Sequence, residues 1–230
     1  MKNSLLIAGT NTDVGKTFVT VSLMYYQEKY GVAESLGLLK LLQTGTGDRE
    51  LYEELFGEQA QIKVVTPLQF TAPLAPPIAA EQEGKTIDLK LVWQSLSQLQ
   101  QHQDIVLIEA LGGLGSPITK ELTVANLAAD WRLPTVLVVP VELGAIAQAV
   151  ANVALARSLN INLKGIILSC TSGHSQTQQQ DLAPVELIES LTQTRVLGTL
   201  PYIENIKDRE PIIKAVTNWD LELMELISNS

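Results

Sequence analysis

The chain has 230 residues, of which 46% are hydrophobic, and this suffices for one sizeable core but not for a second full domain. Its formal net charge of −9 disfavours a nucleic-acid partner, because binding to a phosphate backbone depends on basic surface. Its longest apolar runs fall far short of the roughly 18 residues that a membrane-spanning helix needs. We therefore expect one cytoplasmic domain over residues 1–230, with neither a nucleic-acid nor a membrane partner.

Apolar runs of strand length alternate with amphipathic stretches of helix length along the chain. The runs expected to form buried strands are residues 5–8, 36–42, 105–108, 135–141 and 163–168. The stretches expected to form helices are residues 16–30, 89–102, 124–131, 145–160 and 182–192. This alternation predicts a single-domain α/β fold like that of P-loop NTPases, with a mostly parallel sheet, helices on both faces, and ligands at the carboxyl ends of the strands.

The segment between the first expected strand and the first expected helix has the composition of a phosphate-binding loop. It reads Gly9-Thr10-Asn11-Thr12-Asp13-Val14-Gly15-Lys16-Thr17, with its first glycine one position earlier than in the usual motif. Glycine lets the backbone curl around phosphate oxygens, Lys16 reaches the terminal phosphates, and the Thr17 hydroxyl suits Mg²⁺. The segment therefore predicts a nucleotide site.

Lys40 stands inside an otherwise apolar run, Leu38-Leu39-Lys40-Leu41-Leu42. Burying an unpaired ammonium group is costly, so the side chain either extends to solvent from the strand end or faces a polar cleft. The residues alone leave these two interpretations open.

A nucleotide site also needs oxygen ligands for Mg²⁺, which takes one or two carboxylates and completes its shell with water and phosphate. Glu109 is the better candidate, because it follows the strand predicted at 105–108 and should emerge beside the first strand. Asp48, in the glycine-rich segment 44–48, is a second candidate, although this composition also suits an ordinary turn. Thr17, Asp48 and Glu109 are thus the expected metal ligands.

Two segments interrupt the alternation of strands and helices. Residues 67–77 contain four prolines and are expected to form a structured loop, whereas the polar, glutamine-rich residues 172–181 are expected to form a mobile loop. His102 and His174 have no second His or Cys at ligand spacing, so we expect both at the surface. Cys170 lies in an apolar run, which predicts a small buried side chain without a disulfide partner.

The phosphate loop and several later segments together resemble the dethiobiotin synthetase family. The similarity extends from Leu5 to about Tyr202, and its further segments are residues 40–45, 70–77, 81–84, 109–113, 143–144 and 197–201. The resemblance implies a ligase that uses CO₂ and MgATP to convert 7,8-diaminopelargonate into dethiobiotin in biotin biosynthesis. One amine takes up CO₂ as a carbamate, the carbamate attacks the γ-phosphate, and the second amine closes the ureido ring.

The resemblance also implies roles for individual residues. It assigns the nucleotide to Asn11, Thr12, Asp13, Val14, Gly15, Lys16, Thr17, Ser169 and Pro201, and Mg²⁺ to Thr17, Asp48 and Glu109. It assigns the carbamate to Thr12, Lys40 and Thr44, so the expected catalytic residues are Lys40, Lys16 and Thr12. The substrate carboxylate would meet the helix start formed by Leu143, Gly144, Ala145 and Ile146 at the interface of a homodimer.

The chain also departs from the family pattern at several positions. Leu41 replaces a proline, Ala110-Leu111 replaces Gly-Ala, Ser169 replaces an asparagine near the adenine, and Glu142 stands where some members have a basic residue. These departures leave the nucleotide preference open. The alternatives are a partition-type ATPase, which carries an additional lysine at the position of Asn11, and a synthetase-like regulatory domain that has lost activity. An amidoligase would need a glutaminase domain for which 230 residues leave no room.

Overall fold

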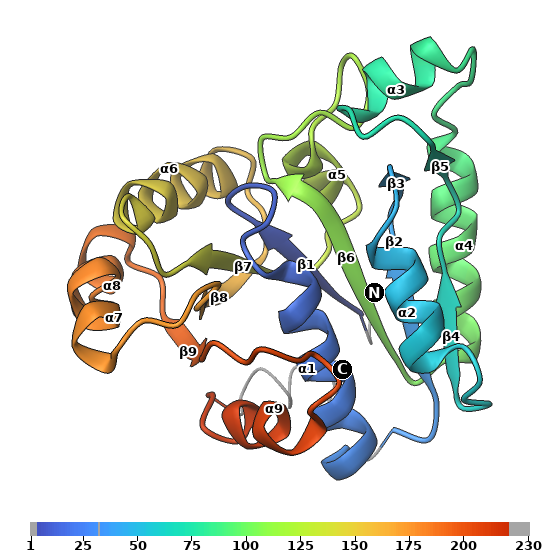
Figure 1. Ribbon diagram of the computed structural model, residues 1–230. Helices are drawn as coiled ribbons and strands as arrows, with labels where there is room; N and C mark the ends of the chain where they lie inside the picture. The colour runs from blue at the N-terminus through green and yellow to red at the C-terminus, as the bar shows by residue number, and fades with distance from the viewer. Residues whose placement is uncertain (1–3, 32, 221–230) are drawn as a thin grey trace.

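A seven-stranded sheet forms the centre of the computed structural model, which describes residues 4–31 and 33–220 (Figure 1). Its strands are β1 Ser4–Gly9, β2 Leu36–Lys40, β4 Ile62–Val65, β6 Ile105–Gly113, β7 Thr135–Pro140, β8 Leu163–Ser169 and β9 Val196–Leu200. Their order across the sheet is β4-β2-β6-β1-β7-β8-β9, and every neighbouring pair is parallel. A small second sheet pairs β3 Gln43–Thr44 with β5 Gln69–Phe70.

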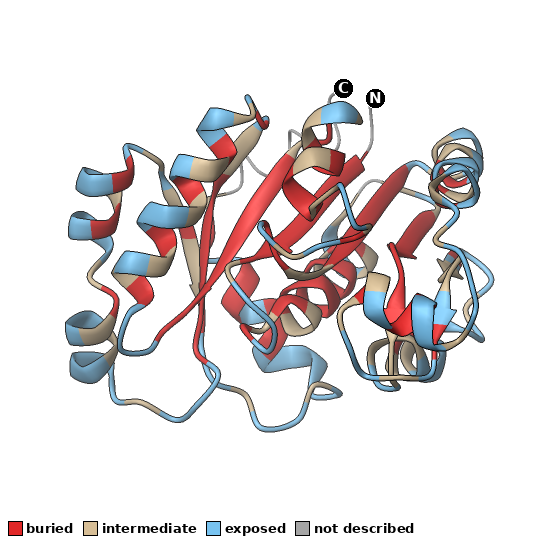
Figure 2. Ribbon diagram, turned by 90° about the horizontal axis from the view of Figure 1, so that it is seen from above, coloured by how far each residue is buried: buried red, intermediate tan, exposed pale blue. Residues whose placement is uncertain are grey.

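Helices cover both faces of the main sheet, as the alternation of the sequence predicts (Figure 2). One face carries α1 Lys16–Tyr30, α2 Asp48–Phe56 and α9 Arg209–Val216. The other face carries α4 Leu89–His102, α5 Val124–Asp130, α6 Ala145–Ser158 and α8 Val185–Thr192. Two further helices, α3 Pro76–Gln82 and α7 Gln176–Leu182, lie in the connections.

The two faces of the sheet belong to two apolar clusters, and alternate residues of a strand enter each of them. In β1, Leu6 and Ala8 join the cluster under α4 to α8, whereas Leu5 and Ile7 join the cluster under α1, α2 and α9. Strands buried on both sides must be apolar along their length, so polar groups gather where the strands end. That requirement places the functional side chains at the carboxyl edge of the sheet.

The chain changes direction around β1, which is flanked by β6 on one side and β7 on the other. After β1 the chain crosses to β2 on the far side of β6, and after β6 it crosses back to β7. In open parallel sheets, ligands bind at such a switch point, beyond the carboxyl ends of the strands. The loop that follows β1 lies at this point.

Most predicted elements are confirmed, with shifted ends. The helix at 16–30 is observed over the same residues, but the strand predicted at 36–42 ends at Lys40. The expectation of a loop throughout 172–181 is wrong, because Ser175 and Gln178 form a capping box that starts α7. The helix predicted at 182–192 is interrupted, since α7 ends at Leu182 and Pro184 precedes a new helix, α8.

Several elements are not predicted by the sequence pattern, and one of them changes the setting of a site residue. Asp48 is the first residue of α2 and does not lie in a turn. Residues 62–65, 196–200 and 209–216 form β4, β9 and α9. Among the described residues, no helix is both long enough and apolar enough to cross a membrane.

Candidate active site

The loop after β1 has the backbone of a phosphate cradle. Gly15 has φ 91°, and a Cβ at this position would collide with the Ser169 hydroxyl, so both the conformation and the space require glycine. No side chain caps α1, which begins at Lys16, and its first backbone N–H groups are therefore available to an anion. The Lys16 ammonium donates a 2.8 Å hydrogen bond to the Asn11 carbonyl, which folds this side chain over the loop.

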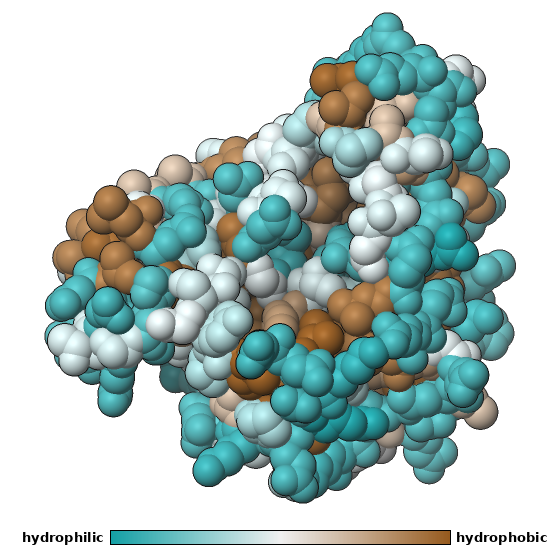
Figure 3. All heavy atoms as spheres, viewed as in Figure 1, coloured by the Kyte–Doolittle hydropathy of each residue, from teal (hydrophilic) through white to brown (hydrophobic). Residues whose placement is uncertain are grey.

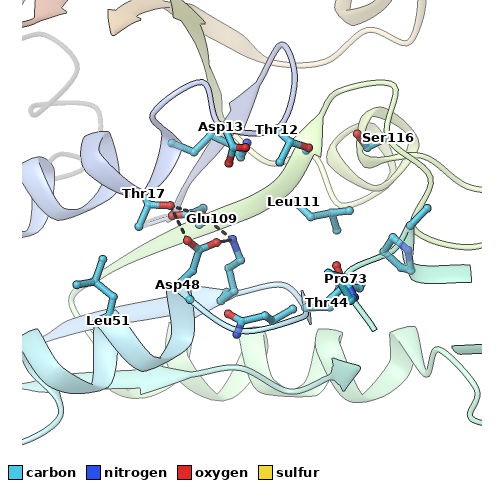
Figure 4. Close-up of a pocket in the computed structure, with 18 of the residues that line it drawn as sticks. Thr12, Asp13, Thr17, Thr44, Asp48, Leu51, Pro73, Glu109, Leu111 and Ser116 are labelled. Carbon is cyan, nitrogen blue, oxygen red and sulfur yellow. Dashed lines mark hydrogen bonds and ion pairs between the residues drawn. The ribbon is translucent and has the colours of Figure 1, made fainter. Parts of the chain in front are cut away.

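A cavity of about 940 Å³ opens in front of the loop (Figure 4). It is lined by many of the predicted site residues, namely Thr12, Asp13, Gly15, Lys16, Thr17, Lys40, Thr44, Asp48 and Glu109. No site role was predicted for the rest of its wall, which includes Phe18, Leu42, Gln43, Leu51, Pro73, Leu74, Ala75, Pro76, Ser116 and Ile206. The fold thus brings the predicted phosphate, metal and carbamate residues into one cavity.

Lys40, Asp48, Glu109 and Thr17 form one hydrogen-bonded cluster in the floor of this cavity. Lys40 Nζ donates to Glu109 Oε1 at 2.6 Å and also to Asp48 Oδ2. Thr17 Oγ1 lies 3.0 Å from Asp48 Oδ1 and 3.1 Å from Glu109 Oε1, and Figure 4 shows these three side chains turned toward one another. Lys40 and Glu109 are register partners on β2 and β6, whereas the start of α2 supplies Asp48.

These contacts decide between the two interpretations of Lys40. Its side chain is only 3% exposed and does not extend to solvent, so it faces a polar cleft. Burial opposes its charge, but the carboxylates of Glu109 and Asp48 outweigh this effect and raise its pKa. Burial likewise opposes the charge of Asp48, and the neighbouring Lys40 ammonium outweighs it and lowers the pKa of this carboxyl group. The pair is therefore an ammonium and a carboxylate at neutral pH.

Lys16 is in a different electrostatic setting. Burial lowers its pKa to about 8, because the nearby carboxylate of Glu109 offsets only part of the desolvation and the Lys40 ammonium adds repulsion. Without a bound anion, Lys16 is therefore the less well-compensated of the two cavity lysines. A phosphate group would supply the missing counter-charge.

Three oxygen-bearing side chains of the cluster have the chemistry that Mg²⁺ requires. Thr17, Asp48 and Glu109 offer one hydroxyl and two carboxylates, all hard ligands, within hydrogen-bonding distance of one another through Thr17. Over residues 4–31 and 33–220, no group of three or more His, Cys, Asp or Glu side chains could hold a metal by itself. Such a sparse donor set fits an ion that takes its remaining ligands from phosphate and water.

Two buried polar residues that the sequence interpretation missed support this cluster. The Tyr52 hydroxyl donates to Glu109 Oε2 from one turn further along α2. The side-chain oxygen Oε1 of Gln43 accepts a hydrogen bond from the backbone N–H of Arg49 at 2.7 Å, and its Nε2 donates to Glu50 Oε2 at 3.0 Å, which fixes the start of α2. The apolar spacing of Leu51, Tyr52, Leu55 and Phe56 was the signal that could have revealed this helix.

The remaining predicted residues do not line the cavity. Ser169 is 2% exposed at the end of β8 and lies against Gly15, while Pro201 is exposed directly after β9. Leu143 is 91% exposed, and Gly144, with φ 98°, precedes α6. The predicted tail site therefore lies outside the main cavity. Cys170 is buried, as expected.

Sequence comparison finds close relatives along nearly the whole chain. A family model described as an AAA domain matches residues 3–210. The ATP-dependent dethiobiotin synthetase of Gloeothece citriformis is 59% identical over 219 residues, which cover 95% of this chain and 97% of the relative. The protein of the same name from Crocosphaera subtropica is 55% identical over 221 residues, covering 96% and 99% of the two chains.

Structural comparison finds the same architecture in more distant proteins. A ParA family ATPase from Chlorobium tepidum superposes with a TM-score of 0.57 at 10% identity, covering 98% of this chain and 96% of the other. The MinC–MinD cell division complex of Aquifex aeolicus contains a chain with a TM-score of 0.61 at 14% identity, with 96% of each chain covered. At these identities the likeness shows the P-loop fold alone.

Proposed function

The chain belongs to the ATP-dependent dethiobiotin synthetase family and is an ATP-dependent ligase of biotin biosynthesis, and on this basis we propose how its residues perform the reaction. The substrates are 7,8-diaminopelargonate, CO₂ and ATP, and the products are dethiobiotin, ADP and phosphate. The observation that carries the proposal is the Lys40–Asp48–Glu109–Thr17 cluster, which lies in one cavity with the phosphate loop.

The nucleotide binds along the loop from Asn11 to Thr17. The β- and γ-phosphates lie against the free N–H groups at the start of α1, and Lys16 exchanges the Asn11 carbonyl for a phosphate oxygen. The base lies toward Ser169 and Pro201, at the adjoining ends of β8 and β9. The proximity of Ser169 to Gly15 supports this placement, because it puts the end of β8 against the loop.

Thr17, Asp48 and Glu109 would hold Mg²⁺, with phosphate oxygens and water as its remaining ligands. When bound, the ion would neutralise charge on the phosphates. The two carboxylates balance the charges of Lys16 and Lys40, so the phosphates of the nucleotide would supply the excess negative charge that attracts a divalent cation. The oxygen-rich donor set supports this assignment.

Thr12, Lys40 and Thr44 hold the carbamate that forms when one substrate amine takes up CO₂. The Lys40 ammonium has three N–H donors, and the two carboxylates use two of them. The third is available to an oxygen of the carbamate or of the γ-phosphate. A carbamate oxygen then attacks the γ-phosphorus and ADP leaves. The second amine next attacks the carbamoyl carbon, phosphate departs, and the ureido ring closes. The residues act by positioning and by stabilising charge.

The substrate carboxylate binds at the start of α6, formed by Leu143, Gly144, Ala145 and Ile146, where a second copy of the chain completes the site. Exposed apolar side chains support a homodimer through this part of the surface, because water disfavours Leu143 at 91% exposure and Val185, the first residue of α8, at 40%. Figure 3 shows apolar surface gathered at the left, over the start of α6 and the adjoining α8.

The buried, unpaired Cys170 suits a reducing cytoplasm.

A single reaction mixture tests the proposed function. Purified protein is incubated with diaminopelargonate, bicarbonate, Mg²⁺ and ATP, and the product is identified from its mass by mass spectrometry. We expect dethiobiotin with equimolar ADP, and no product when ATP is omitted. A folded protein that binds MgATP but forms no dethiobiotin would contradict the proposal.

A further inference from the structure

Tyr52 is a buried polar residue to which the steps above assign no role. It lies on α2, four residues after Asp48, so that both side chains leave the same face of the helix. Its side chain is 0% exposed, and its ring joins the apolar cluster under α1, α2 and α9. Packing alone would be served equally well by a phenylalanine, so the hydroxyl group requires a separate explanation.

The hydroxyl group of Tyr52 meets the Thr20 side chain and one carboxylate, that of Glu109. It donates to Oε2, while Oε1 of the same carboxylate accepts from Lys40 Nζ at 2.6 Å and from Thr17 Oγ1 at 3.1 Å. The two oxygens therefore have different surroundings. Oε1 contacts Lys40 and Thr17 in the cavity floor, whereas Oε2 is held by Tyr52 of α2.

This anchoring matters because the terminal torsion of a glutamate is broad and does not fix the carboxylate plane by itself. Glu109 is 0% exposed, so solvent cannot replace a missing donor at Oε2. A partner on each oxygen is then what holds the plane. Groups that orient a metal ligand through its second atom commonly affect metal affinity without touching the ion.

We propose that Tyr52 is a positioning residue that holds Glu109 Oε2, so that Oε1 is presented to the divalent cation beside Thr17 and Asp48. This inference rests on the proposed metal role of Glu109. Because Asp48 and Tyr52 share one face of α2, the helix sets both carboxylates of the donor set at once: it carries one carboxylate and orients the other.

The test removes only the hydroxyl group, in Tyr52→Phe, and measures binding of Mn²⁺ as the probe ion. Free Mn²⁺ is followed by electron paramagnetic resonance in the presence of saturating ADP, with no turnover required. We expect the dissociation constant for Mn²⁺ to rise about 10- to 100-fold, while metal-free ADP binding in EDTA stays unchanged. The Mg²⁺ concentration that gives half-maximal turnover should rise in parallel.

Tyr25→Phe is the matched control, because Tyr25 is 2% exposed in the same apolar cluster and contacts Phe56 and Arg209. It should bind Mn²⁺ like the wild type. If Tyr52→Phe does not fold, Tyr52→Leu removes the same hydroxyl group with a strong helix former and should show the same loss. Wild-type Mn²⁺ affinity in a folded Tyr52 variant would overturn the inference. Failure of the proposed function is separate, since it appears as wild-type protein that forms no dethiobiotin.

Discussion

The floor of the cavity and the start of α6 are both proposed to bind anionic parts of the reactants, but they are built differently. In the floor, Lys40 and Glu109 are 3% and 0% exposed, and each polar group has a partner from another element. At the start of α6, Leu143 is 91% exposed, no side chain caps the helix, and the donors on offer are backbone N–H groups beyond Ala145, whose own N–H bonds to the Glu142 carbonyl. The first region is formed by residues of one chain, whereas the second is proposed to be completed by a second copy of the chain.

The difference suggests a division within the fold between the groups proposed to act on the reacting atoms and the groups proposed to bind the unreactive end of the substrate. In the proposed mechanism, charge that moves during the reaction is met by side chains held between β2, β6 and α2, because preorganised charges need little rearrangement as the reaction proceeds. The unreactive end of the substrate needs only binding, which uncharged backbone groups can supply. Variants in the floor should therefore change the rate, and variants at the start of α6 should change substrate affinity.

Lys16→Ala should have the largest effect. The Lys16 ammonium donates its hydrogen bond to the Asn11 carbonyl, within the same loop. The neighbouring β1 and α1 are stabilised by their own buried apolar residues, which the substitution leaves in place. Turnover should fall by roughly 10³-fold or more, since a phosphate-binding cation is lost. The melting temperature should stay within a few degrees. Near-normal dethiobiotin formation by the folded variant would remove the nucleotide assignment.

Lys40→Gln comes next and tests the carbamate role. Loss of one well-placed charged donor typically costs about 2.7 to 4 kcal/mol, or roughly 10²- to 10³-fold in rate. The rate of ring closure should fall by this factor, with little change in ATP affinity, because Lys16 and the loop remain. The two measurements are the steady-state rate and calorimetric ATP binding. An unchanged rate would show that the ammonium only neutralises Asp48 and Glu109.

The two lysines should also differ in their response to pH. Burial lowers the pKa of Lys16 to about 8, whereas the carboxylates around Lys40 raise its pKa. The cationic form of Lys16 attracts phosphate, so kcat/KM for ATP should be constant below pH 8 and fall up to tenfold per pH unit above it. Lys16→Arg cannot lose its charge in this range and should show no such fall. A wild-type profile that stays flat to pH 10 would contradict the assignment.

The sequence predicted the parts of the site that follow from local pattern. The phosphate loop, the helix over 16–30 and the apolar strands each have a period or a motif that specifies them. Lys40 was ambiguous because its environment depends on β6 and α2, which lie far away in the sequence. Pairing between strands, and not local propensity, decides where such a residue points.

The sequence interpretation failed where a short helix carries the site. Residues 48–56 were not predicted as a helix, because the glycines of the preceding segment suggested a turn. This omission also hid Tyr52, whose contact with Glu109 joins residues 57 positions apart. The polar helix α7 was missed for a similar reason, since composition outweighed the capping signal of Ser175 and Gln178.

Leu143→Asp should affect only the second region, the start of α6. If a second copy of the chain covers this exposed side chain, a carboxylate there opposes both the apolar contact and the substrate's own carboxylate. We expect KM for diaminopelargonate to rise about tenfold, which corresponds to about 1.4 kcal/mol, with kcat and KM for ATP nearly unchanged. Sedimentation should show a lower average mass. Tyr30→Asp is the control, at a 53% exposed position at the end of α1, and should change neither KM for diaminopelargonate nor the average mass.

The smallest expected effect concerns the base of the nucleotide, where Ser169 stands at the end of β8, against Gly15 of the phosphate loop. The side chain is 2% exposed and lies against Gly15, so its hydroxyl group has little freedom to reach a base edge. A hydroxyl group also cannot match the paired donor and acceptor of an amide. We therefore expect GTP or CTP to support turnover within roughly tenfold of ATP, a discrimination of at most about 1.4 kcal/mol. Ser169→Ala should keep the same ratios, because the proposed preference does not depend on the hydroxyl group. Strict dependence on ATP in both proteins would show that backbone groups read the base. Strict dependence that disappears in Ser169→Ala would show instead that this hydroxyl group selects adenine.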